Sequence, residues 1–438
     1  MIILRSGAII VVLCLQLTCL ASCAAVNRVF PNLIHPVEDL LTDSIPADQS
    51  NDGQPDSANP DATDPLASRE GSATPKPVPA GQTSAERPIE TAVPDAAFDE
   101  QVTGLIKATL DQYRDKAVLD SIFTRYHFAE SQSDELIAHI YDLYEVFFRE
   151  NPQYFWLDGS ARITYSILQT EQPSFSALTL EMGVASGFAT ASAETLQSRQ
   201  TALMDEVRRI AWDAENYSEP WQKLLYVHDT LIREMVYDTT LNQDFNNAAS
   251  ALLDHKTLCQ GYAQSFQLIV KALGFKVSLI SGLADNIDHA WNLVWLDNQP
   301  YHVDLTHDDP VPDGGSDDPV THIHFLRSDE MMRQTHVWTA EDYPPVTVDG
   351  AQFYRLQDLL VATNDELSSR IADFVNRVDL GDNQADLLEL LYTGSDVPSE
   401  TTVEDTLVSD LREKSGVRSI VYRSSIDKNV VSIELLPS

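Results

Sequence analysis

The fold follows from the segment Thr257-Leu258-Cys259-Gln260-Gly261-Tyr262-Ala263. It opens an apolar helical pattern, because Tyr262, Phe266, Ile269, Val270 and Leu273 fall at i, i+4, i+7, i+8 and i+11. Gly274 follows where a left-handed helix cap is expected. Cys259 is therefore predicted to lie at a helix N-terminus. There, free N–H groups and the helix dipole favour the thiolate, which is the nucleophilic form of cysteine. The alternative is a buried structural cysteine.

A hairpin predicted downstream supplies a base and a carboxylate. Residues 288–296 read as a strand, Asp297-Asn298 as a turn, and residues 301–306 as the return strand. With a two-residue turn, Trp291 faces Asp304, and His289 lies on the same side of the sheet. Diagonal neighbours on a sheet lie roughly 7–8 Å apart at the backbone. Asp304 can therefore hold one imidazole nitrogen of His289 while the other nitrogen faces Cys259.

Three separated blocks resemble the transglutaminase-like superfamily, and its bacterial branch in particular. They are Cys259-Gln260-Gly261-Tyr262-Ala263, His289-Ala290-Trp291-Asn292 and Tyr301-His302-Val303-Asp304-Leu305-Thr306, with Gly282 between the first two. A helix expected over residues 221–235, followed by Tyr237-Asp238, is similar to the segment that precedes the cysteine in that branch. The resemblance covers roughly residues 205–345. One departure is His307, which stands where the family pattern commonly has a Trp.

The resemblance implies an α+β fold with a papain-like core, in which the Cys lies on a helix N-terminus and the His and Asp on an antiparallel sheet. It implies Cys259 as the nucleophile, His289 as the general base and then acid, and Asp304 as the residue that orients His289. The chemistry would be acyl transfer through a thioester, with attack by an amine giving transamidation and attack by water giving hydrolysis or deamidation. The residues expected to bind substrate are Gln260, Gly261, Tyr262, Trp291 and Asn292.

The oxyanion site is predicted only in part. The backbone N–H of Cys259 is a candidate donor, because it points into the site from the helix start. Trp221 and Trp291 could add an indole N–H, but the sequence favours a packing role for both. No cofactor is expected.

Two classes of function remain open. The first is an extracytoplasmic cysteine enzyme that acts on peptide or protein amides, either as an acyltransferase or as a cysteine peptidase. The second is a catalytically silent module of the same fold, which binds or scaffolds a peptide of the cell envelope. The sequence does not decide between hydrolysis and amine transfer, because it does not show whether water is excluded.

The N-terminus predicts export. Arg5 precedes an apolar run over residues 8–20, which suits the core of a signal peptide and is short for a membrane span. The run ends in Leu20-Ala21-Ser22-Cys23, which resembles a bacterial lipobox. We therefore expect residues 1–22 to be removed and Cys23 to be lipidated. The protein would be anchored to the bacterial cell envelope and face outside the cytoplasm. The alternative is an ordinary signal peptide with a chance Cys.

Charge and composition limit the partners and divide the chain. A formal charge of -38 over 438 residues argues against nucleic acid, whose phosphates would be repelled. The expected partners are a peptide or protein substrate and the membrane, reached through the lipid on Cys23. Residues 23–95, rich in Pro, Asp and Ser, predict a disordered tether. The folded parts are predicted as an N-terminal α+β region (96–205), the transglutaminase-like catalytic domain (206–345) and a C-terminal α+β module (346–438).

Further elements follow from periodicity. Outside the catalytic motifs, helices are expected over residues 133–149, 196–212, 221–235, 352–362, 364–378, 384–391 and 403–413. Strands are expected over residues 161–168, 176–182, 321–326, 417–422 and 430–435. Residues 239–251 are expected to form a loop that reaches towards the cleft.

Metal binding is not expected from the spacing of polar residues. Five aspartates between His307 and Asp318 lack EF-hand spacing, so a solvated acidic loop is predicted. His302, His307, His322 and His324 are near one another in sequence but lack zinc-ligand spacing. His228, on the apolar stripe of helix 221–235, is interpreted as a core histidine rather than a ligand.

Overall fold

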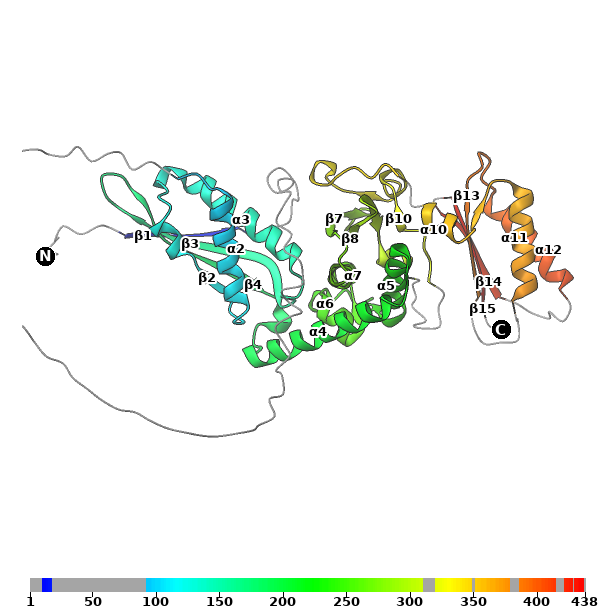
Figure 1. Ribbon diagram of the computed structural model, residues 1–438, viewed down its shortest axis with the longest axis horizontal. Helices are drawn as coiled ribbons and strands as arrows, with labels where there is room; N and C mark the ends of the chain where they lie inside the picture. The colour runs from blue at the N-terminus through cyan, green and yellow to red at the C-terminus, as the bar shows by residue number, and fades with distance from the viewer. Residues whose placement is uncertain are drawn as a thin grey trace, which may run out of the picture.

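Three modules follow one another along the long axis of the molecule (Figure 1). The structure is a computed structural model, and it describes residues 10–17, 92–309, 320–348, 351–378, 386–414, 421–427 and 429–436. Cys23 and residues 23–91 of the predicted tether lie outside the described residues. In the described part of the chain, no helix is both long and apolar enough to cross a membrane.

The first module is a four-stranded sheet of order β1-β3-β4-β2, against which helices α2 and α3 pack (Figure 1). Its elements are α2 (Ala96–Leu110), β2 (Lys116–Val118), η2 (Asp120–Thr124), η3 (Glu130–Gln132), α3 (Ser133–Glu150), β3 (Leu157–Leu168), β4 (Ser174–Val184) and η4 (Ser186–Phe188). Helix α3 buries Leu136, Ile140, Leu143 and Phe147, one helical face, as its sequence predicts. The predicted strands at 161–168 and 176–182 lie within β3 and β4.

Strand β1 (Ile10–Leu17) forms one edge of this sheet. It pairs antiparallel with β3, and Ile10 lies opposite Leu168. The segment belongs to the apolar run predicted to be a signal-peptide core, and it begins with β-branched residues, which also favour strands. Removal of residues 1–22 stays a prediction.

The middle module surrounds one buried helix, α7 (Cys259–Ala272), whose residues 261–270 are all buried. Helices α4, α5 and α6 and strands β7 and β8 contact it. The other elements before the sheet are α4 (Ala193–Ala214), α5 (Pro220–Glu234), β5 (Val236–Tyr237), η5 (Gln243–Phe245), α6 (Ala248–Asp254) and β6 (Lys256–Thr257). Helix α4 runs across the limit predicted between residues 205 and 206.

A five-stranded sheet of order β10-β9-β8-β7-β11 carries the second half of this module. Its elements are β7 (Val277–Ala284), β8 (Ile287–Leu296), β9 (Gln299–Val303), α8 (Leu305–Asp308), β10 (Phe325–Arg327), α9 (Asp329–Met332), β11 (His336–Val337) and η7 (Ala340–Asp342). The strand predicted over residues 321–326 is wrong for most of its length, because β10 begins only at Phe325.

The β8–β9 hairpin has the predicted register. Leu296 lies opposite Gln299 and Asn292 lies opposite Val303. Asp297 and Asn298 both take positive φ, at 52° and 62°, which is the geometry of a two-residue type I′ turn. The return strand ends at Val303, however, and not at residue 306. The reason is Asp304, whose carboxylate accepts the N–H groups of Thr306 and His307 and so starts helix α8.

The C-terminal module is a sheet of order β12-β13-β15-β14 with helices α11 and α12 beside it (Figure 1). Its elements are α10 (Ala351–Leu356), β12 (Leu360–Val361), α11 (Asn364–Arg377), β13 (Asp386–Tyr392), α12 (Glu400–Glu413), β14 (Val421–Asp427) and β15 (Val430–Leu436). The helix predicted over 352–362 ends at Leu356, and β12 follows it.

The helix predicted over residues 384–391 is wrong, because this segment is strand β13. Leu388 and Leu390 belong to the core of the C-terminal module, whereas Leu391 belongs to the core shared with the rest of the chain. A strand buried on both faces loses the alternation of polar and apolar residues. Its continuous apolar run is then indistinguishable from a buried helix.

Candidate active site

Cys259 is the first residue of α7 and its side chain is half-buried. Gly274 takes φ +83° beyond the far end of the helix, as predicted. The backbone N–H of Cys259 lies in the first turn, where N–H groups have no acceptor within the helix. The next amide, that of Gln260, donates to Asn246 Oδ1 at 3.0 Å, which ties this turn to the segment before α6.

Gly261 lets the chain around Cys259 pack closely. A Cβ at this position would lie 1.7 Å from Thr257 Oγ1 and 2.9 Å from the carbonyl oxygen of Asn247. Any side chain would therefore displace β6 or the start of α6. The motif needs glycine here for packing, and the predicted contact of Gly261 with substrate stays a prediction.

The structure brings Cys259, His289 and Asp304 together. His289 lies on β8, and its Nε2 donates to Asp304 Oδ2 at 2.8 Å. The side chain of Cys259 is close enough to His289 to contribute to the raised pKa of its ring. Because Asp304 occupies Nε2, we assign Nδ1 as the nitrogen that meets the sulfur. The arrangement is that of a nucleophile, an acid–base group and an orienting carboxylate.

Asp304 is shared by two further histidines that the sequence did not assign to this role. His307 Nδ1 lies 2.8 Å and His336 Nε2 2.9 Å from the same oxygen, Oδ2. His307 comes from α8, and His336 from β11, which reaches the site because Gly282 on β7 has no Cβ. A Cβ on Gly282 would lie 2.3 Å from the carbonyl oxygen of Val337. No sequence pattern could identify His336, because it lies 32 residues beyond Asp304.

The charges of this cluster follow from burial and these contacts. Burial alone would lower the pKa of His289, but Asp304, with a contribution from Cys259, raises it to about 10. Burial alone would raise the pKa of Asp304, but His289 and His307 hold it well below its usual range. At neutral pH His289 therefore carries a proton next to Cys259. The order implied by the resemblance, base first and then acid, stays a prediction, and a protonated ring allows the reverse order.

Trp291 and Asn292 support the site from the interior and do not line it. Trp291 is 1% exposed, its indole N–H donates to His302 Nδ1 at 3.0 Å, and its ring stacks on His289 at 5.8 Å between centroids. Asn292 is fully buried, and its Nδ2 donates to the carbonyl of Ala263 at 3.0 Å. Their predicted contact with substrate is corrected accordingly, and the indole of Trp291 is not available to an oxyanion.

Tyr262 requires the same correction. It is 1% exposed, on the buried side of α7, and its hydroxyl donates to Asp309. Among the five residues predicted to bind substrate, Gln260 is the one that keeps partial exposure, and it adjoins Cys259.

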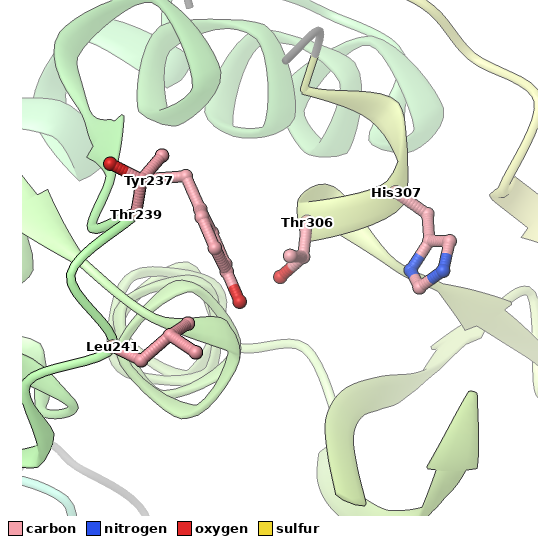
Figure 2. A pocket seen from close by; sticks show the side chains of 5 residues that line it. All are labelled: Tyr237, Thr239, Leu241, Thr306 and His307. Carbon is pink, nitrogen blue, oxygen red and sulfur yellow. The ribbon is translucent and has the colours of Figure 1, made fainter. Parts of the chain in front are cut away.

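A pocket of about 410 Å³ lies next to the Asp304 cluster, since His307 is one of its lining residues. The others are Tyr237, Thr239, Leu241 and Thr306 (Figure 2). Figure 2 shows the hydroxyl groups of Tyr237 and Thr306 pointing towards one another across it. Burial and then the nearby Cys259 raise the pKa of Tyr237, so the phenol stays protonated. Thr306 Oγ1 is buried and has no hydrogen-bond partner among the described residues. The loop predicted over 239–251 does reach the pocket, but α6 begins at Ala248.

The acidic segment after Asp304 was predicted to be a solvated loop. Its two described aspartates, Asp308 and Asp309, are instead buried. Asp308 is fully buried and Asp309 is 7% exposed. Asp308 contacts His228 Nε2 at 3.2 Å and His324 Nδ1 at 3.0 Å, and Asp309 accepts from Tyr262. Residues 310–319 lie outside the described residues. His228 is a buried histidine with hydrogen-bond partners, as its sequence position predicts.

The family profile of the Transglutaminase-like superfamily matches residues 207–305. This part of the chain is a transglutaminase-like domain. Its limits include Cys259, His289 and Asp304, and the predicted fold class, α+β with a transglutaminase-like core, is confirmed. No curated protein matches the chain.

Solved structures show likeness to about a third of the chain at low sequence identity. A TGase is 12% identical over 32% of this chain and 43% of its own, with a TM-score of 0.24. A proposed cysteine protease from Cytophaga hutchinsonii is 14% identical over 34% and 55%, with a TM-score of 0.22. The periplasmic domain of TgpA from Pseudomonas aeruginosa is 15% identical over 36% and 76%, with a TM-score of 0.20. The chain spans about half the length of the first two.

Proposed function

We propose that the protein is an extracytoplasmic cysteine enzyme that cleaves peptide or protein amides through a thioester. The observation that carries the proposal is the contact between Cys259 and a protonated His289, which Asp304 holds from the other side. A thiolate beside an imidazolium is a nucleophile with its proton donor already in place. The alternative of a silent binding module does not require this pair.

In the first half-reaction the thiolate of Cys259 attacks the carbonyl carbon of the amide, and a C–S bond forms. The carbonyl oxygen becomes negative, and the backbone N–H of Cys259 can donate to it. The Tyr237 hydroxyl, which lies close to Cys259, is the second donor that we propose. His289 then gives its proton to the amide nitrogen, the C–N bond breaks, and an amine leaves.

In the second half-reaction the neutral ring of His289 accepts a proton from water or from an amine. The new nucleophile attacks the thioester carbon, the C–S bond breaks, and Cys259 returns as thiolate while His289 is again protonated. Water gives a carboxylic acid and an amine gives a new amide. Either nucleophile would approach through the pocket, one wall of which is formed by Tyr237, Thr306 and the apolar Leu241.

Alkylation of Cys259 tests this proposal without a known substrate. With Cys14, Cys19 and Cys23 replaced by Ser, Cys259 is the remaining thiol of the full chain. Iodoacetamide should alkylate it at neutral pH, and His289→Gln should slow the reaction roughly tenfold, because the neighbouring positive charge is lost. His336→Gln is the matched control, since it removes a histidine that contacts Asp304 but is not placed to meet the sulfur.

Equal alkylation rates in the parent and in His289→Gln would contradict the proposal. The thiol would then be uncoupled from the ring, and a binding module would be the better description. Measurement in urea provides a second control, because the difference between the variants should disappear when the fold is lost.

We also propose that the protein is anchored to the bacterial cell envelope by a lipid on Cys23 and works outside the cytoplasm. The lipobox-like run Leu20-Ala21-Ser22-Cys23 supports this location. Cells given labelled palmitate should incorporate the label into the wild-type chain but not into Cys23→Ser. Equal labelling of the two would contradict the anchor.

A further inference from the structure

A second histidine cluster lies apart from the Cys259 site. Three donor atoms converge there: His228 Nδ1, Asp229 Oδ1 and His322 Nε2. Asp229 Oδ1 lies 3.0 Å from each of the two nitrogens, and one ligand atom of each residue lies within 4.8 Å of the others. His228 and Asp229 are neighbours on α5, whereas His322 comes from the segment before β10.

Each imidazole of this cluster also meets a carboxylate through its far nitrogen. His228 Nε2 lies 3.2 Å from Asp308 Oδ2, and His322 Nδ1 lies 2.7 Å from Glu389 Oε2. A carboxylate on the far nitrogen is the usual support of a metal-binding histidine, because it fixes the tautomer and the orientation of the ring. Both histidines therefore present their inner nitrogens, with Asp229, to one point.

We propose that His228, Asp229 and His322 form a binding site for a divalent transition-metal ion, with Zn²⁺ as the best fit, and that Asp308 and Glu389 orient its two histidines. Two imidazoles and a carboxylate are a common ligand set for zinc. Bonds of about 2.0–2.2 Å in a tetrahedron require donors about 3.3–3.6 Å apart. The nitrogen–oxygen distances of 3.0 Å need only a small expansion to reach this.

Charge and access are compatible with a bound ion. Three carboxylates, those of Asp229, Asp308 and Glu389, surround the two histidines. Contacts with the histidines and Arg233 balance part of this charge without a metal, and a bound cation would add to that balance. The side chains of Asp229 and His322 keep 19% and 12% exposure, so solvent reaches part of the cluster. Arg233 lies 3.6 Å from the other oxygen of Asp229 and is 48% exposed, so it can turn outward.

The site would join two modules. Asp229 belongs to α5 of the middle module, and Glu389 to β13 of the C-terminal module. His322 contacts both, and its backbone N–H donates to Glu389 Oε1 at 3.0 Å. An ion on His322 would therefore clamp the C-terminal module to the helix that packs against α7. We infer a structural role for the ion.

The cluster at Asp304 is a weaker candidate for the same ion, although His289, Asp304, His307 and His336 also converge. In both clusters the nitrogens share one carboxylate oxygen, but at Asp304 one of the histidines, His289, also faces Cys259 on its other side. Of its histidines, His307 has a carboxylate near its far nitrogen, with Asp285 Oδ2 at 3.7 Å, whereas the far nitrogen of His336 lies next to the hydroxyl of Thr335. The difference between the two clusters gives the experiment its control.

The experiment uses the full chain, freed of metal with a chelator and then dialysed against Zn²⁺ at micromolar concentration. Elemental analysis should find about one zinc per chain, and the thermal midpoint should rise by several degrees. Asp229→Asn and His322→Gln should both lose the bound zinc and the thermal shift. The control His307→Gln/His336→Gln should keep both. Glu389→Gln should keep the ligands but weaken affinity about 10–100-fold.

Co²⁺ in place of Zn²⁺ gives a second readout, because its absorption reports nitrogen ligands in a tetrahedral field. The spectrum should disappear in His322→Gln and persist in the double control. Circular dichroism of each metal-free variant shows whether it is folded. If Asp229→Asn does not fold, His322→Gln alone tests the site. Zinc lost only from the double control would place the ion at Asp304 and overturn the proposal. Failure of the wild-type chain to retain zinc would overturn it as well.

Discussion

Replacing Asp304 by Asn should lower kcat/KM on a peptide amide by about 10³–10⁴-fold, with Cys259 and His289 still in place. The carboxylate oxygen Oδ2 accepts from His289 Nε2 at 2.8 Å. An amide nitrogen at this position would donate instead, so the ring would have to carry its proton on Nδ1, which faces the sulfur. Such a ring cannot accept a proton from the attacking water or amine. The loss of charge also removes the main contact that raises the pKa of His289.

The control for this variant is His336→Gln, measured on the same substrate. It removes one histidine from Asp304 but leaves the contact with His289, so we expect less than about a tenfold loss. Asp304→Asn should also slow alkylation of Cys259, whereas His336→Gln should not. If Asp304→Asn keeps a tenth or more of the wild-type kcat/KM, the function of His289 does not depend on this carboxylate.

The sequence predicted the three central residues because each rests on a local signal. Cys259 opens a helix with its own cap, and the positive-φ turn at Asp297 and Asn298 fixes the register that puts His289 and Asp304 on one side. His336 carries no such signal. Its place depends on β11 pairing with β7, a contact between segments that are far apart in the chain.

The surroundings of the site were predicted less well, because burial is a property of the whole fold. Tyr262, Trp291 and Asn292 belong to the family motif, and motif membership favoured contact with substrate. The structure instead buries all three, and each holds a neighbour through a side-chain hydrogen bond. Leu241 and Thr239 carry no family motif, but they reach the pocket from the loop that was predicted to extend towards the cleft.

The buried aspartates and Glu389 show the same limit. A run of acidic residues after Asp304 is typical of a solvated loop, yet Asp308 is enclosed by His228 and His324. Glu389 lies in an apolar segment that predicts a helix, yet as a strand residue it points away from its own module's core and meets His322. Partners 67 and 80 residues away decide both positions, and no local pattern contains them.

Asp308→Ala should lower the free energy of unfolding at neutral pH by about 3–5 kcal/mol, the cost of removing one partner of a buried ion pair. Asp308 is fully buried and its carboxylate accepts the backbone N–H of His324 at 2.9 Å as well as meeting His228 and His324 side chains. Lys107→Ala breaks an ion pair of 2.8 Å whose side chains are 48% and 46% exposed, and should cost less than about 1 kcal/mol. Urea unfolding in a buffer with chelator compares the two.

The difference in unfolding free energy between wild type and Asp308→Ala depends on pH if it comes from the charge of Asp308, and does not if it comes from packing. Burial alone would raise the pKa of Asp308, but His228 and His324 hold it below its usual value of 3.8. A carboxylate with a lowered pKa adds stability that is present above 3.8 and is lost as the pH falls through the folded value. The gap between wild type and Asp308→Ala should therefore narrow as the pH falls below 3.8. A gap that stays constant with pH would mean that Asp308 stabilises the site by filling space, and that its charge contributes nothing.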